Sequence, residues 1–338
     1  MDTQAQPTIS AVVAAYQAEK WIAEAIESIL GQTSPPDEVI VVNDGSTDGT
    51  GRELAKFGDR IRVIDRANGG CPAAFNTAFA AARFDFVAMC GADDIWEPQK
   101  LEWQREAIIA HPDVDLLSGH AVMIGLIEAE HHRPPGAGVL DSEALRNSLF
   151  AEGCVICAPT MVIRRELFER LGPFVENFGA DDYEYWFRAL RTGARFYYEP
   201  RPLVRWRQHG DNLSWKSSWM DECAYKVRTS YEGEVTDAAI RAQGFGPSLF
   251  RMARHQVDSD ESARARRTFR QALRYQQGLD TGESARALAW IAILCLPSGL
   301  RKASGTALVR ASRGVDNVLG IRQPLRSLPA DPNRSSST

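Results

Sequence analysis

The sequence predicts an α/β fold, a mostly parallel β-sheet with helices on both faces, followed by a helical extension. The first observation is that short apolar, β-branched runs alternate with amphipathic stripes over residues 1–112. This alternation favours parallel strands joined by right-handed crossover helices. The second observation is a helical pattern throughout residues 216–300. With 338 residues, the chain is long enough for one large or two modest domains.

The expected strands and helices follow one another along the chain. The stripe of Trp21, Ile22, Ala25 and Ile29 has the spacing of a helix packed on a sheet, and Gly31 ends it. Strands are expected at residues 9–13, 39–42, 61–64, 84–89, 114–118 and 161–163. Helices are expected at residues 21–30, 52–57, 72–83, 98–110, 164–171 and 181–192.

The composition is typical of a globular protein in a reducing compartment. Hydrophobic residues make up 44% and charged residues 25% of the chain. No secretory leader opens the sequence, and no apolar run reaches the roughly 18 residues that span a bilayer. The six cysteines lie mostly in apolar surroundings, so we expect a cytoplasmic protein with free thiols. Cys154 and Cys157 form a lone C-x-x-C pair, which disfavours a zinc or redox site.

Charge is unevenly spread along the chain. The net charge is −5, yet residues 261–338 hold 13 Lys and Arg against 5 Asp and Glu. This indicates a basic C-terminal module on an acidic body. Ala287–Leu296 is an apolar stretch flanked by Arg286, Arg301 and Lys302, which would allow shallow insertion at the inner face of a membrane. The alternative is that this stretch is an ordinary core helix of a helical cap.

Two carboxylates, Asp93 and Asp94, follow the expected strand at residues 84–89. Ligands of parallel sheets bind beyond the carboxyl ends of the strands, and paired carboxylates there suit a divalent cation held together with phosphate oxygens. The alternative is that both residues only cap the helix that follows.

Further polar residues occupy a turn and a helix start. Asp44 lies in a turn after the strand at residues 39–42, where it would accept hydrogen bonds from a base or ribose, or else bond its own backbone. Asp181 and Asp182 open a helix, so capping is the alternative to a catalytic role. The pair at residues 131–132 lies in a Pro/Gly-rich loop, which favours solvated His side chains over a metal site.

Five separated blocks resemble glycosyltransferase family 2. They are residues 9–16, 25–33, 41–50, 68–70 and 92–94, in the order that the family has them. Residues 157–160, 179–188 and 203–214 resemble later parts of the family, so that the likeness covers about residues 8 to 215. The resemblance implies the GT-A fold, whose sheet is Rossmann-like, and transfer of a sugar from a nucleoside diphosphate donor with inversion.

The resemblance also implies roles for individual residues. Asp182 would be the general base, with Asp181 and Trp186 on the acceptor side. The donor would be a UDP-, dTDP- or GDP-sugar, bound by Ala15, Tyr16, Asp44, Asn76 and Asp93. A divalent cation, Mn²⁺ or Mg²⁺, would be held by Asp93, Asp94 and His209, although His209 would alternatively contact diphosphate or bond to backbone.

Three departures from the family pattern stand out. Ala14 and Gln17 replace the usual Pro and Asn of the first loop, which predicts a change of loop geometry alone. Phe75 replaces the Arg that often precedes Asn76, which removes one contact to diphosphate. Gly91 replaces the first Asp of the common Asp-x-Asp-Asp motif, which puts affinity for metal and ribose in question.

These observations predict four segments. Residues 1–112 would bind the nucleotide-sugar, residues 113–215 the acceptor, residues 216–322 would form the helical extension and residues 323–338 a disordered tail. The acceptor would be a glycan or lipid-linked glycan of a surface polysaccharide, with no nucleic-acid partner. The competing functions are a non-catalytic nucleotide-sugar-binding or scaffold protein and a nucleotidyltransferase, although Ala14–Lys20 is not the phosphate loop of the latter.

Overall fold

The strands of this computed structural model, which describes residues 6–131, 133–176, 179–212 and 217–295, form one mixed sheet. Its order is β3-β2-β1-β4-β9-β6-β10-β5, with β7 on β6 and β8 on β10. The strands are β1 (Ile9–Ala15), β2 (Glu38–Asn43), β3 (Arg62–Asp65), β4 (Phe86–Gly91), β5 (Ile95–Trp96), β6 (Leu116–Gly125), β7 (Ala129–Glu130), β8 (Gly138–Val139), β9 (Val162–Arg164) and β10 (Phe196–Gln208).

The parallel part of the sheet confirms the sequence prediction. β1 pairs in parallel with β2 and β4, and β2 with β3, so the carboxyl ends of these four strands meet at one edge. β9 runs antiparallel between β4 and β6, and the short strands β5, β7 and β8 also pair antiparallel with their neighbours. β6 is twice as long as expected and pairs in parallel with β10.

Helices surround the sheet and continue beyond it. They are α1 (Ile22–Leu30), α2 (Thr50–Ala55), α3 (Cys71–Ala81), α4 (Lys100–Ala110), α5 (Ser142–Glu152), α6 (Arg165–Leu171), α7 (Asp181–Arg191), α8 (Ser217–Tyr231), α9 (Ala238–Asp258), α10 (Ser262–Ala272) and α11 (Thr281–Ile293). Short 3₁₀ turns lie at Gly58–Arg60, Ala158–Thr160, Glu232–Glu234 and Leu273–Gly278. The helical pattern of residues 216–300 is thus confirmed as far as residue 295.

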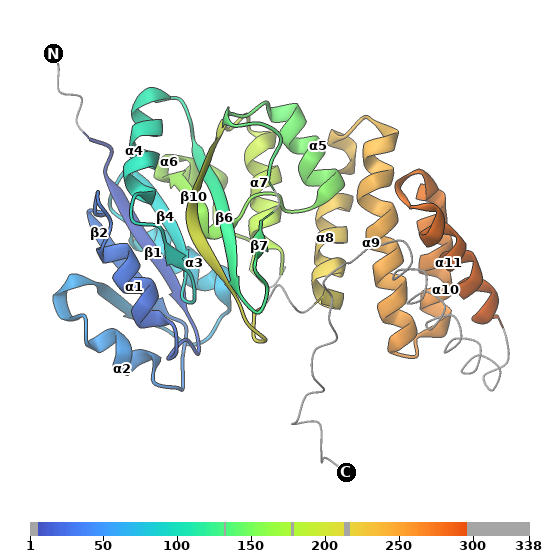
Figure 1. Ribbon diagram of the computed structural model, residues 1–338, viewed down its shortest axis with the longest axis horizontal. Coiled ribbons are helices and arrows are strands. Elements are labelled where there is room, and N and C mark those ends of the chain that lie inside the picture. The colour runs from blue at the N-terminus through green and yellow to red at the C-terminus, as the bar shows by residue number, and fades with distance from the viewer. Residues whose placement is uncertain (1–5, 132, 177–178, 213–216, 296–338) are drawn as a thin grey trace, which may run out of the picture.

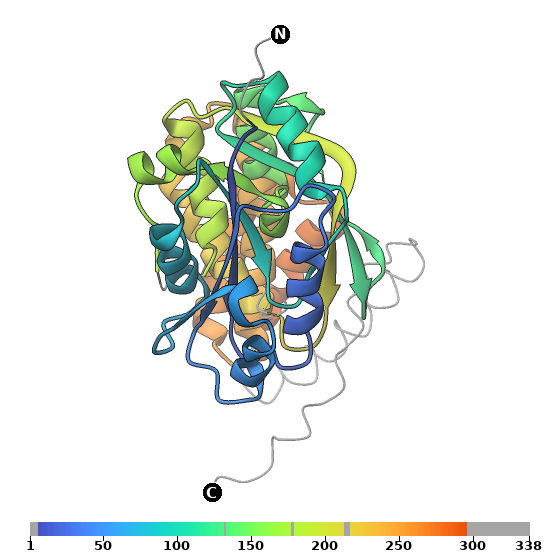
Figure 2. The same ribbon diagram turned by 90° about the vertical axis from the view of Figure 1, so that its left-hand side faces the viewer.

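Alternating side chains of β1 divide the core into two layers, as the two-residue period of a strand requires. Ile9, Ala11 and Val13 pack with apolar residues of α1, α2 and α4 on one face. Val12 packs with those of α3, α5, α6 and α7 on the other face. Figure 1 shows both layers, and in Figure 2 the sheet lies in front of the C-terminal helices.

The C-terminal helices join the second core layer without a break. The ring of Phe245 on α9 meets that of Phe150 on α5 edge to face at 5.2 Å. The Arg228 guanidinium of α8 donates a hydrogen bond to the Phe150 carbonyl at 2.6 Å. Ala287 and Trp290 of α11 are buried in the same core, which favours the core-helix alternative over membrane insertion of this stretch.

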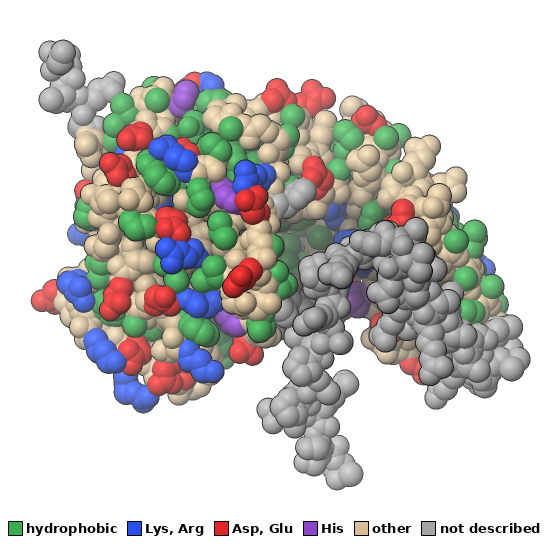
Figure 3. All heavy atoms as spheres, viewed as in Figure 1, with side chains coloured by type: hydrophobic (Ala, Val, Ile, Leu, Met, Phe, Trp, Pro, Cys, Tyr) green, Lys and Arg blue, Asp and Glu red, His purple; other side chains and the backbone are tan. Residues whose placement is uncertain are grey.

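The face of the sheet domain that Figure 3 shows has no large region of one charge. Asp, Glu, Lys and Arg side chains are interspersed over the face of the sheet domain in Figure 3. Within the part of the chain that the structure describes, we find no helix with both the length and the apolar character needed to cross a membrane. Residues 301, 302 and 323–338 lie outside the described residues.

Candidate active site

The carboxyl ends of β1, β2 and β4 bring the first polar residues together. Ala15 is paired with Asn43 across β1 and β2, and Ala14 with Gly91 across β1 and β4. The residues just beyond these pairs, including Asp44 and Asp93, therefore emerge at the same edge of the sheet. This is the edge at which α/β folds bind their ligands.

Asp44 is buried and held by the turn of Gly69 and Gly70. The Gly70 backbone N–H donates to its Oδ2 at 2.8 Å, and the Gly69 N–H donates at 3.1 Å. Arg66 adds an ion pair at 3.4 Å. Gly70 has φ of 89°, a left-handed conformation that glycine adopts at little cost. The carboxylate thus bonds the backbone of a distant turn, in place of its own.

Ala15 ends β1 and Tyr16 follows it, and their side chains differ in exposure. Ala15 is buried, and its carbonyl accepts a hydrogen bond from the Asp44 N–H at 2.8 Å. Tyr16 is 54% exposed, which leaves its ring free to meet a ligand. Of the two expected donor contacts, only Tyr16 therefore presents an exposed side chain.

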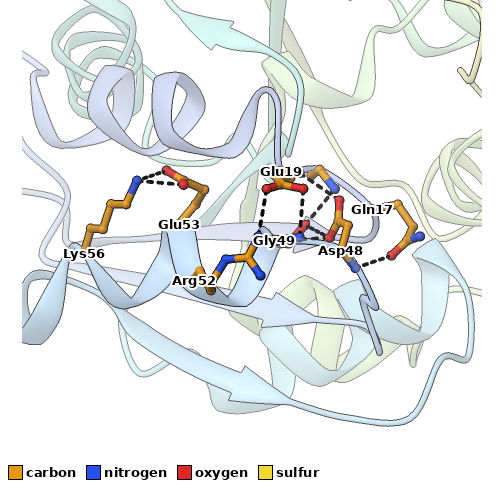
Figure 4. Close-up of polar contacts among 9 residues, drawn as sticks. Gln17, Glu19, Asp48, Gly49, Arg52, Glu53 and Lys56 are labelled. Carbon is orange, nitrogen blue, oxygen red and sulfur yellow. Dashed lines mark hydrogen bonds and ion pairs between the residues drawn. The ribbon is translucent and has the colours of Figure 1, made fainter.

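The loop after Tyr16 is locked to the loop after Asp44, as Figure 4 shows. Gln17 Oε1 accepts hydrogen bonds from the backbone N–H groups of Thr47 at 2.7 Å and Asp48 at 3.3 Å. The Gly49 N–H donates to Glu19 Oε2 at 2.9 Å. Gln17 itself has φ of 50°, an uncommon conformation for a residue other than glycine. Gln17 thus helps to fix the geometry of these two loops.

Asp93 and His209 form a pair that joins β4 to the end of β10. His209 Nε2 lies 2.9 Å from Asp93 Oδ2, and the Asn212 amide donates to the same oxygen at 3.3 Å. The imidazole is stacked against the ring of Trp21, with centroids 5.9 Å apart. Both members of the pair remain about one quarter exposed, at 23% for His209 and 27% for Asp93.

Asp94 has a different environment from Asp93. It is buried, and its Oδ1 accepts the backbone N–H of Arg207 at 3.0 Å. Burial raises the pKa of Asp94 well above its usual range, and the negative charge of Asp93 adds to the rise. A Cβ at Gly91 would overlap the Asp94 carboxylate, so the glycine leaves room for this inward conformation.

Arg207 connects this turn to α1. Its Nε donates to the Asp93 carbonyl at 2.9 Å, and its Nη2 forms an ion pair with Glu24 at 2.5 Å. The guanidinium also lies over the Trp21 ring, 4.4 Å from the centroid. Arg207 thus holds both Asp93 and Asp94 in place through backbone and side-chain contacts.

The donor atoms around Asp93 fit a cation bound mainly through a substrate. Among the described residues, no three His, Cys, Asp or Glu side chains are grouped as ligands of one ion. Asp93 and His209 supply two adjacent donors, while the inward conformation of Asp94 directs its Oδ1 to a backbone N–H. Mg²⁺ typically takes one or two protein carboxylates plus phosphate oxygens, so two protein donors suffice when a diphosphate supplies others.

The second acidic pair opens α7. The Tyr183 N–H donates to Asp182 Oδ1 at 2.7 Å, and the Cys154 thiol lies 3.8 Å from Asp182 Oδ2. Burial raises the pKa of Asp182, although these two hydrogen bonds oppose the rise. Burial also raises the pKa of Asp181 to about 7, with a further contribution from Asp182. The Asp181 carboxyl group therefore has an affinity for protons suited to acid–base chemistry near neutral pH.

Cys71, the first residue of α3, lies near acidic side chains from several parts of the chain. Burial raises the pKa of its thiol well above the usual range, and four carboxylates add to the rise. They are Asp181, Asp182, Asp93 and Asp44. The structure thus brings acids from three separate parts of the sequence around one point at the start of α3.

Two expected site residues have structural contacts instead. The expectation that Trp186 faces an acceptor is wrong, because its side chain is fully buried and packs edge to face on Phe196. Asn76 exchanges hydrogen bonds with the backbone of Phe174, accepting at 2.8 Å and donating at 2.9 Å. Its amide thereby ties α3 to the segment after α6, so a donor contact would have to compete with these bonds.

Part of the chain matches a known protein family. The model of glycosyl transferase family 2 matches residues 10–172. The chain carries a glycosyltransferase family 2 domain. The match takes in the donor-side residues and Cys154, whereas Asp182 and His209 lie beyond it. The match confirms the resemblance to glycosyltransferase family 2 that the sequence blocks indicate.

Curated relatives of this chain include uncharacterized glycosyltransferases of Rickettsia species. That of Rickettsia prowazekii is 30% identical over 217 residues, which are 60% of this chain and 64% of the relative. That of Rickettsia felis is 28% identical over 255 residues, which are 72% of this chain and 41% of the relative. The chain thus spans less than two thirds of the length of these relatives.

Solved structures of S. aureus TarS share the fold. TarS 1–349 superimposes with a TM-score of 0.61 at 19% identity, covering 93% of this chain and 92% of that chain. TarS 1–349 in complex with UDP-GlcNAc gives a TM-score of 0.57 at 17% identity, covering 85% and 90%. The similarity shows that the family 2 domain has the GT-A fold that the sequence resemblance implied.

Sequence reasoning missed three residues around the family 2 site. Arg207 lies two positions before His209, and this spacing in the last block was the available signal. Trp21 was counted only as part of an apolar stripe, and Cys71 only as a buried thiol. All three act through partners distant in sequence, which a local pattern does not contain.

Proposed function

We propose that this protein is an inverting glycosyltransferase that moves a sugar from a nucleoside diphosphate donor to a hydroxyl acceptor. The observation that carries this proposal is the convergence of Asp44, Asp93, Asp181 and Asp182 around Cys71. A donor carboxylate, a metal-binding carboxylate and a base are the groups that a direct displacement of diphosphate requires. The family 2 domain supports the same reaction class.

Asp182 is the proposed general base. In its ionised form it accepts the proton of the acceptor hydroxyl while the oxygen attacks the anomeric carbon, and the bond to diphosphate breaks on the opposite face. One displacement inverts the anomeric configuration. Its Oδ1 and Oδ2 are oriented by the Tyr183 N–H and the Cys154 thiol, so the carboxylate is positioned before the acceptor arrives.

Asp93 and His209 are the proposed protein ligands of a divalent cation, Mn²⁺ or Mg²⁺. When bound, the cation would act as a Lewis acid for the departing diphosphate. Arg207 supports this pair by holding the Asp93 carbonyl and the Asp94 carboxylate, so we assign Asp94 a positioning role.

Asp44 and Tyr16 form the proposed nucleoside side of the donor site. The exposed Tyr16 ring offers a surface for stacking, and the turn of Gly69 and Gly70 holds the Asp44 carboxylate at the same edge of the sheet. UDP-GlcNAc is the first donor to test, because TarS 1–349 with the same fold has been crystallised with it. UDP-glucose, dTDP-glucose and GDP-mannose extend the test to other nucleotides.

The proposed acceptor is a glycan or a lipid-linked glycan of a surface polysaccharide, met at the cytoplasmic face of a membrane. Because the apolar face of α11 is buried, membrane contact would rest on charge. Arg267, Arg270 and Arg274 are exposed side chains that could supply it. Binding to anionic vesicles that falls with added salt, and falls further when these three residues are Gln, would support this location.

Thermal unfolding with each nucleotide-sugar, with and without Mn²⁺, tests the donor site first. A ligand at 100 times its dissociation constant stabilises the folded state by about 2.7 kcal/mol, so a match raises the melting temperature. Product analysis then separates the competing functions. Released nucleoside diphosphate and an inverted glycoside support transfer, and stabilisation with no turnover indicates a binding protein. Pyrophosphate released from a nucleoside triphosphate in the presence of a sugar 1-phosphate indicates a nucleotidyltransferase.

A further inference from the structure

Trp219 of α8 is a large aromatic side chain that stays 41% exposed beside the acidic pair. Its six-membered ring packs on Gly179, two residues before Asp181. A Cβ at Gly179 would overlap this ring, and the φ of Gly179 is 86°, so glycine meets both requirements of the contact. The ring is thereby placed at the entrance to α7.

Packing fixes α8 against α7, so the position of Trp219 does not depend on a loop. The two helices lie side by side in Figure 1 and are in contact. The Tyr231 hydroxyl of α8 donates to Glu184 of α7 at 2.7 Å, and its ring stacks on Phe187 at 5.0 Å. Cys223, one turn after Trp219, is buried and close enough to Asp181 for the carboxylate to affect its thiol.

One exposed aromatic ring lies on the donor side of the proposed site, and the other lies beside the acidic pair. Among Phe, Trp and Tyr side chains of the described residues, Tyr16 and Trp219 are the exposed ones. Tyr16 follows β1 on the donor side, whereas Trp219 lies beside the segment that leads into Asp181 and Asp182. Single exposed apolar residues are common on protein surfaces, so exposure alone assigns no role. Trp219 is distinguished by its contact with Gly179, in the segment that precedes the proposed base Asp182.

We propose that Trp219 is a stacking platform for a pyranose ring of the acceptor, and that the acceptor is therefore a saccharide. This inference rests on the proposed glycosyl transfer, with Asp182 as base. One face of a pyranose presents C–H groups, which pack on an aromatic ring while the hydroxyl groups stay hydrated or bonded. A ring stacked on Trp219 would present a hydroxyl to the acidic pair. The C-terminal helices thus contribute to acceptor recognition.

Transfer kinetics with p-nitrophenyl glycosides of N-acetylglucosamine, glucose and galactose test the platform, with UDP-GlcNAc or another stabilising nucleotide-sugar as donor. Trp219→Ala should raise the acceptor KM about tenfold, the size expected for a lost aromatic contact. The kcat and the donor KM should stay close to those of the wild type. Trp219→Phe should retain most of the acceptor affinity because it keeps a ring.

Two further variants separate stacking from packing. Trp219→Leu retains an apolar contact with Gly179 but has no ring face, so its acceptor KM should rise as in Trp219→Ala, even if the Ala variant folds poorly. Leu288→Ala is the matched control, because Leu288 is an exposed apolar residue of α11 in the same helical extension. Its kinetics should equal those of the wild type.

The results distinguish this inference from the proposed function. An unchanged acceptor KM in Trp219→Leu, or a fall in kcat alone, would overturn the stacking platform while transfer itself stands. A wild type that cleaves the donor but uses none of the glycosides would overturn the saccharide acceptor. A wild type that neither binds nor cleaves any nucleotide-sugar would overturn the proposed function itself.

Discussion

His209 Nε2 lies 2.9 Å from Asp93 Oδ2 and connects the end of β10 to the turn after β4. The two residues are 116 positions apart in the sequence, so the parallel and antiparallel pairings of the sheet create their contact. Neither residue is fully buried, and a cation bound by both would replace the hydrogen bond between His209 Nε2 and Asp93 Oδ2. Their neighbour Asp94 is buried and bonded to a backbone N–H.

The first prediction separates Asp93 from Asp94. Asp93→Asn should abolish the part of donor binding that depends on Mn²⁺, because an amide is a poor substitute for a charged carboxylate ligand. Asp94→Asn is the matched control and should retain it, since its Oδ1 would still accept the Arg207 N–H. Calorimetric titration of UDP-GlcNAc with and without Mn²⁺ measures both. Equal losses in the two variants would make Asp94 a ligand as well.

The second prediction concerns the base. Asp182→Asn preserves the size of the side chain and an oxygen for the Tyr183 N–H, but it removes proton acceptance. Transfer should fall by about two to four orders of magnitude with donor affinity little changed. Asp181→Asn should lose less activity. The kcat values of both variants measure these losses. An active Asp182→Asn variant would refute the assignment of Asp182 as the base.

The third prediction is a shift of the pH profile through Cys154. Its thiol lies 3.8 Å from Asp182 Oδ2 and stabilises the ionised carboxylate, so Cys154→Ala should raise the pKa of Asp182. The acidic limb of kcat against pH should then move to higher pH. Cys154→Ser, a stronger hydrogen-bond donor, should move it to lower pH.

Other titratable groups near Asp182 supply the controls for this shift. They are Asp181 and Tyr183 on α7, Cys157 near the 3₁₀ turn at residues 158–160, and Cys71 on α3. Cys157→Ala removes a neighbouring thiol for which the structure gives no hydrogen bond to Asp182, so its pH profile should match the wild type. Identical acidic limbs in Cys154→Ala and Cys154→Ser would show that the thiol does not tune Asp182.

The fourth prediction concerns stability. Lys100 is fully buried, with its ammonium 4.0 Å from the Trp96 ring centroid and bonded to Gln104 Oε1 at 2.8 Å. Burial lowers the pKa of Lys100 to about 7. Between about pH 7 and 10.4 the unfolded chain binds a proton that the folded chain does not, so this residue makes stability rise with pH. Below about pH 7 both states bind the proton, so the free-energy cost of burying the charged Lys100 does not change with pH.

Lys100→Met should remove this contribution. The difference in free energy of unfolding between wild type and Lys100→Met should change by up to about 1.4 kcal/mol per pH unit across the window. Urea denaturation at pH 7, 8 and 9 measures it. Lys20→Met, at an exposed position, is the control and should give a constant difference from the wild type. Parallel curves for Lys100→Met would show that Lys100 does not titrate in this range.

The sequence by itself determined the order of the strands and helices over most of the first half, because each rests on a local period of apolar residues. It also located Asp44, Asp93 and Asp182 at a strand end or helix start, where motif and element boundary coincide. Its errors lie where the local pattern is ambiguous. β6 extends to Gly125 through a stretch with little apolar alternation, and the antiparallel β9 depends on its partners β4 and β6.

Only the tertiary structure decided which polar and aromatic side chains are accessible to a ligand. Trp186 and Trp219 are both tryptophans on helices near the acidic pair, but packing against Phe196 buries the first, while a glycine contact leaves the second exposed. Asp93 and Asp94 are adjacent, yet the Arg207 backbone draws one inward and His209 meets the other. The contacts of Asp93 and Asp94 span more than 100 residues of sequence, which local periodicity and motif spacing do not encode.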